Sequence, residues 1–292
     1  MVTPFTILSD FDGVWTETRD EADALHGQLV QWCTELMGRR PVVEADLAAF
    51  RDEVRASPHS YGWAPDGRIS AFSDEDPLCE LAGLCHLVAR ASSGTARRYR
   101  DAIEGRWPSV QHFAELAFVA AMTRFRAERP PTIVPDARAQ LHAVRATGAE
   151  VVVVSNSEPG KLLAWFQSAG IDASEQPGHD LRVRGSAGKQ VLGGDEVIDI
   201  GGRRIHVDRP RYRAAIEQER PALVIGDVFS LDLSLPHRMR AQGHPAAPRT
   251  LVLRRHAHSP PWVTRDRAAG AIDHVVEHFG DLAPLVAHLE ES

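Results

Sequence analysis

Two aspartates separated by one residue follow the first apolar run of the chain. Residues 5–9 read Phe-Thr-Ile-Leu-Ser and lead directly into Asp10-Phe11-Asp12-Gly13. Carboxylates act in enzymes as nucleophiles, as general acids and bases, or as ligands of hard cations. A single aspartate after a strand is usually a turn or capping residue, so this pair alone does not define a site.

Two further polar clusters follow later apolar runs. Ser155 and Asn156 come after residues 150–154, and Asp227 and Asp232 come after residues 222–225. Ligands of an open parallel sheet bind beyond the carboxyl ends of its strands, so we expect the three clusters to share one crevice. A hydroxyl and an amide at that place suit the binding of an anionic oxygen.

Four carboxylates in one crevice repel one another unless a cation holds them. Hard oxygen ligands without a nearby Cys or His set favour Mg²⁺ over Zn²⁺. The sequence therefore predicts a Mg²⁺ site, and the residues assigned to it are Asp10, Asp12, Asp227 and Asp232.

The elements that position these residues are short apolar strands alternating with helical patterns. This alternation predicts an α/β fold, a Rossmann-like parallel sheet with helices on both faces. The expected strands are residues 5–9, 150–154, 222–225, 250–253 and 272–276, and the expected helices are residues 136–147, 161–169 and 212–219. Residues 181–207, rich in paired glycines, are predicted as one or two hairpins.

More than a hundred residues with helical periodicity separate the first two strands. A structureless loop of that length is implausible, so we predict an inserted all-α domain over residues 19–130, interrupted by a long loop at 57–77. The α/β core then consists of residues 1–18 and 131–292.

The three motifs, in this order, resemble those of the haloacid dehalogenase (HAD) superfamily. The matching segments are Asp10-Phe11-Asp12-Gly13-Val14-Trp15-Thr16, then Ser155-Asn156, then Gly226-Asp227 with Asp232 five residues on. A helical insert after the first motif is similar to the type-1 cap domain of that superfamily. The resemblance covers the core, while the match of the insert is architectural only.

The resemblance implies a Mg²⁺-dependent phosphatase acting on a small phosphorylated metabolite. Asp10 would attack phosphorus and form an aspartyl-phosphate, and Asp12 would protonate the leaving oxygen and then activate water. Mg²⁺ would be held by Asp10, the backbone carbonyl of Asp12 and Asp227, with Asp232 as outer support. Ser155 and Asn156 would orient the phosphoryl oxygens.

The superfamily also uses a lysine beside the nucleophile, and here the sequence departs from the common form. Only two of the 33 basic residues are lysines, Lys161 and Lys189, and the usual position carries Arg209. An ammonium is a compact charge that a guanidinium does not replace everywhere, so a rare lysine is informative. We favour Lys189 as the catalytic lysine and Arg209 second, and expect Lys161 and His256 on the surface.

Composition bounds the remaining classes of function. The net charge of −7 argues against a nucleic-acid-binding surface, and no apolar run is long enough to span a membrane. Three cysteines without metal-ligand spacing and an N-terminus without an export signal predict a cytoplasmic protein. The oligomeric state is left open, with a homo-oligomer among the alternatives.

Other activities on the same scaffold remain open. A phosphomutase or another HAD-type phosphotransferase needs the same residues. Carbon–halogen cleavage has no use for Asp12, and phosphonate cleavage calls for a lysine in the insert, which has none. A catalytically silent scaffold is the alternative from another class, against which the complete set of acidic residues argues.

Overall fold

The structure is a computed structural model that describes residues 5–130, 132–265 and 267–291. The chain divides into two compact units, Met1–Glu17 with Pro131–Ser292, and Thr18–Pro130. These divisions lie within one residue of the boundaries expected from the sequence. Among the described residues, no helix combines the length and the apolar character needed to cross a membrane.

The first unit is built on a seven-stranded sheet in which all paired strands run parallel. The strand order is β11-β10-β9-β1-β4-β6-β5. The strands are β1 (Thr6–Ser9), β4 (Glu150–Val154), β5 (Ala173–Ser174), β6 (Leu181–Arg184), β9 (Leu223–Gly226), β10 (Thr250–Arg254) and β11 (His274–Val276). The predicted parallel sheet is confirmed, with the strand ends shifted by up to two residues.

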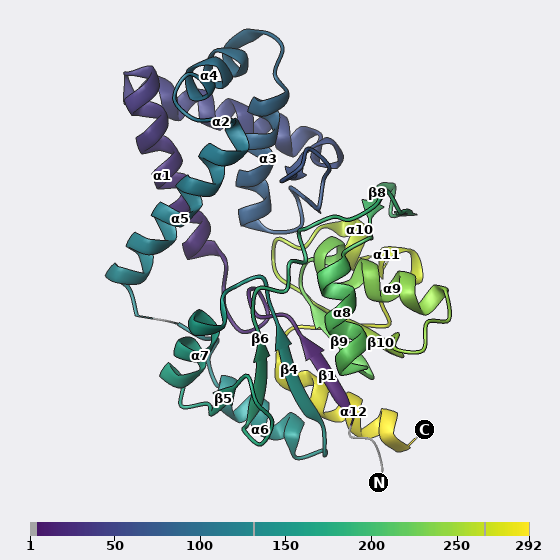
Figure 1. The fold of residues 1–292 in the computed structure, drawn as a ribbon. Coiled ribbons are helices and arrows are strands. Elements are labelled where there is room, and N and C mark those ends of the chain that lie inside the picture. Colours follow the sequence, from purple (N-terminus) through teal and green to yellow (C-terminus); the bar gives the residue numbers. More distant parts are fainter. Residues whose placement is uncertain (1–4, 131, 266, 292) are drawn as a thin grey trace. The chain divides into compact units, whose positions relative to one another are not determined.

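Helices cover both faces of this sheet. Figure 1 shows helices on both sides of the strands. Alternate strand residues such as Ile7, Val151 and Ile225 pack in one core with the helices of the first face. Leu8 and Val152 point to the opposite face, where α8 contacts β1. The helices of the first face are α6 (Ala137–Arg145), α7 (Pro159–Ser168), η3 (Phe279–Asp281) and α12 (Leu282–Glu291). The remaining ones are α8 (Pro210–Glu219), the π-helical turn η2 (Phe229–Leu233), α9 (Ser234–Ala241), α10 (Pro261–Thr264) and α11 (Arg267–Gly270).

One segment predicted as a hairpin is a strand of the main sheet instead. β6 pairs parallel with β4, whereas β7 (Val197–Ile200) and β8 (Arg203–His206) do form an antiparallel hairpin. β6 reads Leu-Arg-Val-Arg, and its two arginines pair with Glu219 of α8. The glycines that follow this short run are the reason that the sequence suggested a hairpin.

The second unit is an almost entirely helical insert with its own apolar core. Its helices are α1 (Arg19–Met37), α2 (Arg40–Ala56), η1 (Pro58–Ser60), α3 (Pro77–Arg90), α4 (Gly94–Glu104) and α5 (Val110–Glu128). The core contains Leu29, Phe50, Leu84 and Phe113. The expectation of an all-α insert needs one correction, because β2 (Gly62–Trp63) and β3 (Ala71–Phe72) form a short antiparallel pair within the predicted loop.

Candidate active site

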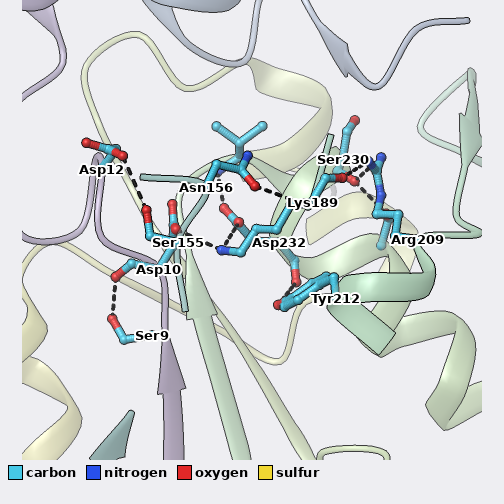
Figure 2. A network of polar contacts seen from close by, with 12 residues as sticks. Ser9, Asp10, Asp12, Ser155, Asn156, Lys189, Arg209, Tyr212, Ser230 and Asp232 are labelled. Carbon is cyan, nitrogen blue, oxygen red and sulfur yellow. Dashed lines mark hydrogen bonds and ion pairs between the residues drawn. The ribbon is translucent and has the colours of Figure 1, made fainter. Parts of the chain in front are cut away.

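The three polar clusters lie at the carboxyl ends of three adjacent strands. Asp10 follows β1, Ser155 follows β4 and Asp227 follows β9, and β1 lies between the other two in the sheet. The Asp10 backbone N–H extends the ladder by donating to the Ile225 carbonyl at 2.9 Å. Polar side chains of the three clusters therefore gather at this edge of the sheet (Figure 2).

Lys189 joins the nucleophile candidate to an acidic residue of the third motif. Its Nζ donates to Oδ1 of Asp10 at 2.7 Å and to Oδ1 of Asp232 at 2.8 Å (Figure 2). The residue is 1% exposed. Burial by itself lowers the pKa of an amine, but Asp10 and Asp232 reverse this and raise the pKa of Lys189, so it is charged. Of the three basic residues considered, it is the one placed beside Asp10.

Arg209 is buried, and it binds the backbone of the loop between β6 and β7 that carries Lys189, here called the lysine loop. Its guanidinium donates to the carbonyls of Lys189, of Ser230 at 2.8 Å and of His206 at 3.1 Å. Tyr212 adds a ring 5.1 Å from Nζ of Lys189 and donates its hydroxyl to the Asp232 carbonyl. These contacts show Arg209 supporting Lys189 rather than replacing it.

Lys161 is not a surface residue, and that expectation was wrong. Its side chain is 7% exposed, and its Nζ donates to Oδ1 of Asp12 at 2.8 Å and to Oγ of Ser157 at 3.1 Å. The ammonium also lies over the rings of Phe11 and Trp165, 5.5 and 5.1 Å from their centroids. The first turn of α7 thus directs Lys161 into the site, which a helix-surface pattern did not suggest.

The Ser-Asn-Ser turn after β4 organises both lysines. Ser157, which the sequence analysis missed, donates its hydroxyl to Oδ2 of Asp12 at 2.9 Å, while Ser155 lies 3.5 Å from the same oxygen. Asn156 accepts the backbone N–H of Lys189 at 2.7 Å, so it holds the lysine loop. The repeated serine within the turn was the only sequence signal for Ser157.

Three of the four predicted metal ligands converge. Carboxylate oxygens of Asp10, Asp227 and Asp232 lie within 4.8 Å of one another among the described residues. The Asp12 carboxylate does not join them, because it turns to Lys161 and Ser157. The expected convergence of four acidic side chains is therefore reduced to three.

The three carboxylates differ in how far protein donors already satisfy them. Both oxygens of Asp232 accept hydrogen bonds, from Lys189 and from the Val228 backbone N–H at 3.1 Å, which suits a supporting role. Burial first, and then the charge of Asp232, raise the pKa of Asp10 to about 7. Such a buried, mutually repelling acidic group fits the charge of a divalent cation, so the donor set is consistent with Mg²⁺.

The charge state of Asp12 is set differently. Burial opposes ionisation of this carboxyl, but the Lys161 ammonium and the hydrogen bonds from Lys161 and Ser157 lower its pKa. Asp10 and Asp12, two residues apart, therefore have pKa values displaced in opposite directions. Such a separation is typical of acidic pairs that take different parts in one reaction.

His256 also lies in the site, contrary to the expected surface position. Its side chain is 5% exposed, and its Nε2 lies 3.6 Å from Oδ2 of Asp227 and 2.7 Å from the Gly13 carbonyl. Burial first, and then Arg254, lower the pKa of His256 to about 4. No motif in the sequence singled out this residue, because it follows a strand that carries no acidic cluster.

No family model matches this sequence, and no curated protein does. Solved structures align with nearly its whole length, at TM-scores below 0.5. CbbY from Rhodobacter sphaeroides in complex with phosphate is 14% identical over 96% of each chain, with a TM-score of 0.46. A HAD family hydrolase from Deinococcus radiodurans with bound phosphate and sodium is 20% identical over 98% of this chain and 97% of its own, also at 0.46.

A putative β-phosphoglucomutase from Thermotoga maritima is 11% identical over 98% of this chain and 99% of its own, with a TM-score of 0.47. Similar structures thus include proteins named as HAD hydrolases, the superfamily that the sequence motifs resemble. At these identities and TM-scores the alignments carry no argument about function, which has to be argued from the residues of the site itself.

Proposed function

We propose that this protein is a Mg²⁺-dependent phosphatase that hydrolyses a small phosphorylated metabolite. The observation that carries the proposal is the bridge from Lys189 to Asp10 and Asp232, with Asp227 within ligand distance of the same group. A buried cation beside a partly exposed carboxylate nucleophile suits a dianionic phosphate, which needs positive charge on several sides.

The residues that would hold the metal are Asp10 and Asp227, with Asp232 and the Asp12 backbone in support. Bound Mg²⁺ supplies neutralisation of the charge on a transferring phosphoryl group. Lys189 supplies a second positive charge from the loop between β6 and β7, and it keeps one oxygen of Asp10 fixed. The nucleophile is therefore oriented before substrate arrives, which lowers the entropic cost of the reaction.

The reaction has two displacements at phosphorus. A carboxylate oxygen of Asp10 forms a bond to phosphorus while the bond to the ester oxygen breaks, and that oxygen takes a proton from Asp12. Water then attacks the aspartyl-phosphate, gives its proton to Asp12, and releases phosphate and the Asp10 carboxylate. Lys161 and Ser157 hold the Asp12 carboxyl in one position and favour its ionised form, which is the form that accepts the proton of water.

The substrate class follows from the second unit. A helical insert of the size of Thr18–Pro130 suits a cap that excludes water and selects the leaving group, and this favours small metabolites over phosphoproteins. The reaction would take place in the cytoplasm, with neither a nucleic acid nor a membrane as a partner.

The test is hydrolysis of p-nitrophenyl phosphate and a panel of phosphorylated metabolites, with and without Mg²⁺. We expect Mg²⁺-dependent release of phosphate by the parent and none by an Asp10→Asn variant. Transfer of the phosphoryl group to a second hydroxyl instead of water would identify a mutase. No metal-dependent activity from a folded preparation, on any member of the panel, would leave a silent scaffold.

A further inference from the structure

The backbone carbonyl of Gly13 receives two side-chain donors from the far end of the chain. Nη1 of Arg254 lies 2.8 Å from this oxygen and Nε2 of His256 lies 2.7 Å from it. Both side chains are buried and both stand at the end of β10, a strand that carries none of the predicted site residues. Two buried donors on one loop carbonyl indicate a fixed position for that peptide.

The hydrogen-bond pattern assigns the tautomer of His256. Nε2 lies against the Gly13 carbonyl, which only accepts, so the hydrogen is on Nε2. Nη1 of Arg254 contacts both ring nitrogens, and Nδ1, at 2.6 Å, is the one that can accept from it. Nε2 donates its hydrogen to the Gly13 carbonyl. Arg254 is itself held by Glu17 at 2.7 Å and by the Glu277 carbonyl at 3.2 Å, so the pair is rigid.

Gly13 is in turn pressed against a predicted metal ligand. Its φ is +80°, and a Cβ placed on it would lie 2.0 Å from Oδ2 of Asp227. His256 borders the same oxygen at 3.6 Å. The donors to Gly13 therefore set how closely the segment carrying Asp12 approaches Asp227.

We propose that Arg254 and His256 are positioning residues: they clamp the Gly13 carbonyl and so hold Gly13, and with it the preceding Asp12 carbonyl, at the distance from Asp227 that Mg²⁺ binding requires. The inference rests on the proposed phosphatase function for its catalytic consequence. The two residues would thus act on the site from the end of β10, outside the three motifs.

His256 and His258 also lie near Asp227 as a group of donors that could themselves hold a metal. The Arg254 guanidinium against the His256 ring opposes a cation there and favours the clamp.

The experiment compares Arg254→Met, His256→Leu and His256→Gln with the parent, and uses Arg255→Met as the matched control. Arg255 is the neighbouring arginine, half-exposed and paired with the Glu277 carboxylate. Gln keeps an N–H donor near the place of Nε2, and Leu does not. The readouts are Mg²⁺ binding by calorimetry without substrate, kcat and KM on p-nitrophenyl phosphate, and amide exchange of residues 10–16.

We expect Arg254→Met and His256→Leu to weaken Mg²⁺ binding by about 10-fold or more, as partners of metal ligands do. The loss should fall on kcat rather than KM, with faster amide exchange at residues 10–16. His256→Gln should recover most of the binding, and Arg255→Met should stay within about twofold of the parent.

Two results would overturn the clamp. One is Mg²⁺ binding and turnover of His256→Leu indistinguishable from those of Arg255→Met. The other is loss of Mg²⁺ binding in His256→Gln as complete as in Asp227→Asn, which would make His256 a ligand. If Arg254→Met does not fold, the contrast between Leu and Gln at position 256 decides. A parent without Mg²⁺ binding or hydrolysis would instead defeat the proposed function, and the catalytic role of the clamp with it.

Discussion

Lys161 places its Nζ 2.8 Å from Oδ1 of Asp12, while the other lysine of the chain, Lys189, contacts Asp10. Both lysines of an otherwise arginine-rich protein are thus buried against the two aspartates of a single motif. A compact ammonium fits between a carboxylate and a serine hydroxyl or a second carboxylate, where a planar guanidinium would need more room. The rare lysines therefore both lie beside the predicted catalytic aspartates, whereas the sequence analysis expected this of Lys189 alone.

Replacing Asp12 by Asn should separate the two displacements. p-Nitrophenolate leaves without a proton from the enzyme, so Asp12→Asn should still form the aspartyl-phosphate but lack the base that activates water. We expect a burst of about one p-nitrophenolate per active site followed by turnover reduced about 10²–10⁴-fold. Stopped-flow absorbance measures both phases.

Substrate chemistry provides the control for Asp12→Asn. An alkyl phosphate needs its leaving oxygen protonated, so the variant should show no burst with it, and Asp10→Asn should show none with either substrate. A linear time course of Asp12→Asn with p-nitrophenyl phosphate, without a burst, would contradict the assigned role of Asp12.

Removing the Lys189 ammonium should both inactivate and destabilise the protein. Lys189→Met leaves Asp10 and Asp232 facing each other in a buried site without their cation. We expect a loss of about 3–5 kcal/mol in the free energy of unfolding, measured by urea denaturation without metal. The double variant Lys189→Met with Asp232→Asn should recover much of this stability but none of the turnover. Turnover of Lys189→Met within a few-fold of the parent would refute the choice of Lys189.

The sequence predicted those parts of the site that depend on strand ends. Apolar runs ending in Asp10, Ser155 and Asp227 indicated three strands, and parallel pairing alone brings their ends to one edge. Lys189 was favoured on chemical grounds, and the structure puts it beside Asp10. Side-chain direction was not predictable, so the expectation that the Asp12 carboxylate would converge with the other three was wrong, and it faces Lys161 instead.

Contacts across long sequence separations were also out of reach. Arg254 and Gly13 are 241 residues apart, and nothing local in either segment indicates the other. The strand β6 was predicted as part of a hairpin because glycines follow it, whereas its partners, β4 and Glu219 of α8, are indicated by no local pattern. Tertiary pairing of charges here overrides the pattern that suggested a hairpin.

Replacing Gly13 by Ala should disrupt the site through Asp227. Alanine at φ +80° is strained, and its Cβ would displace the Asp227 carboxylate. Gly202→Ala is the matched control, since Gly202 has φ +71° and nothing within 4 Å of an added Cβ. We expect Gly13→Ala to lose about 100-fold or more in kcat, as a displacement of about 1 Å can cause. Gly202→Ala should lose stability but keep kcat. An equal loss of kcat in the two variants would mean that backbone strain, and not the contact with Asp227, is responsible.

His86 should make the stability of the helical unit depend on pH. It lies on α3, is 5% exposed, and burial followed by Arg90 lowers its pKa from 6.5 to about 4. In the unfolded chain His86 takes up a proton near pH 6.5, whereas in the folded chain it stays neutral down to about pH 4. The unfolded state therefore binds more protons in this window, and stability falls as the pH falls from 6.5 to 4.

Urea denaturation across that range should give a plot of unfolding free energy against pH that is steeper for the parent than for His86→Gln, by at most about 1.4 kcal/mol per pH unit. The carboxylates that titrate in the same window are common to both proteins and cancel in the difference. His59→Gln, at an exposed position of the same unit, is the control and should follow the parent; parallel curves for the parent and His86→Gln would show that the histidine is protonated without loss in the folded state.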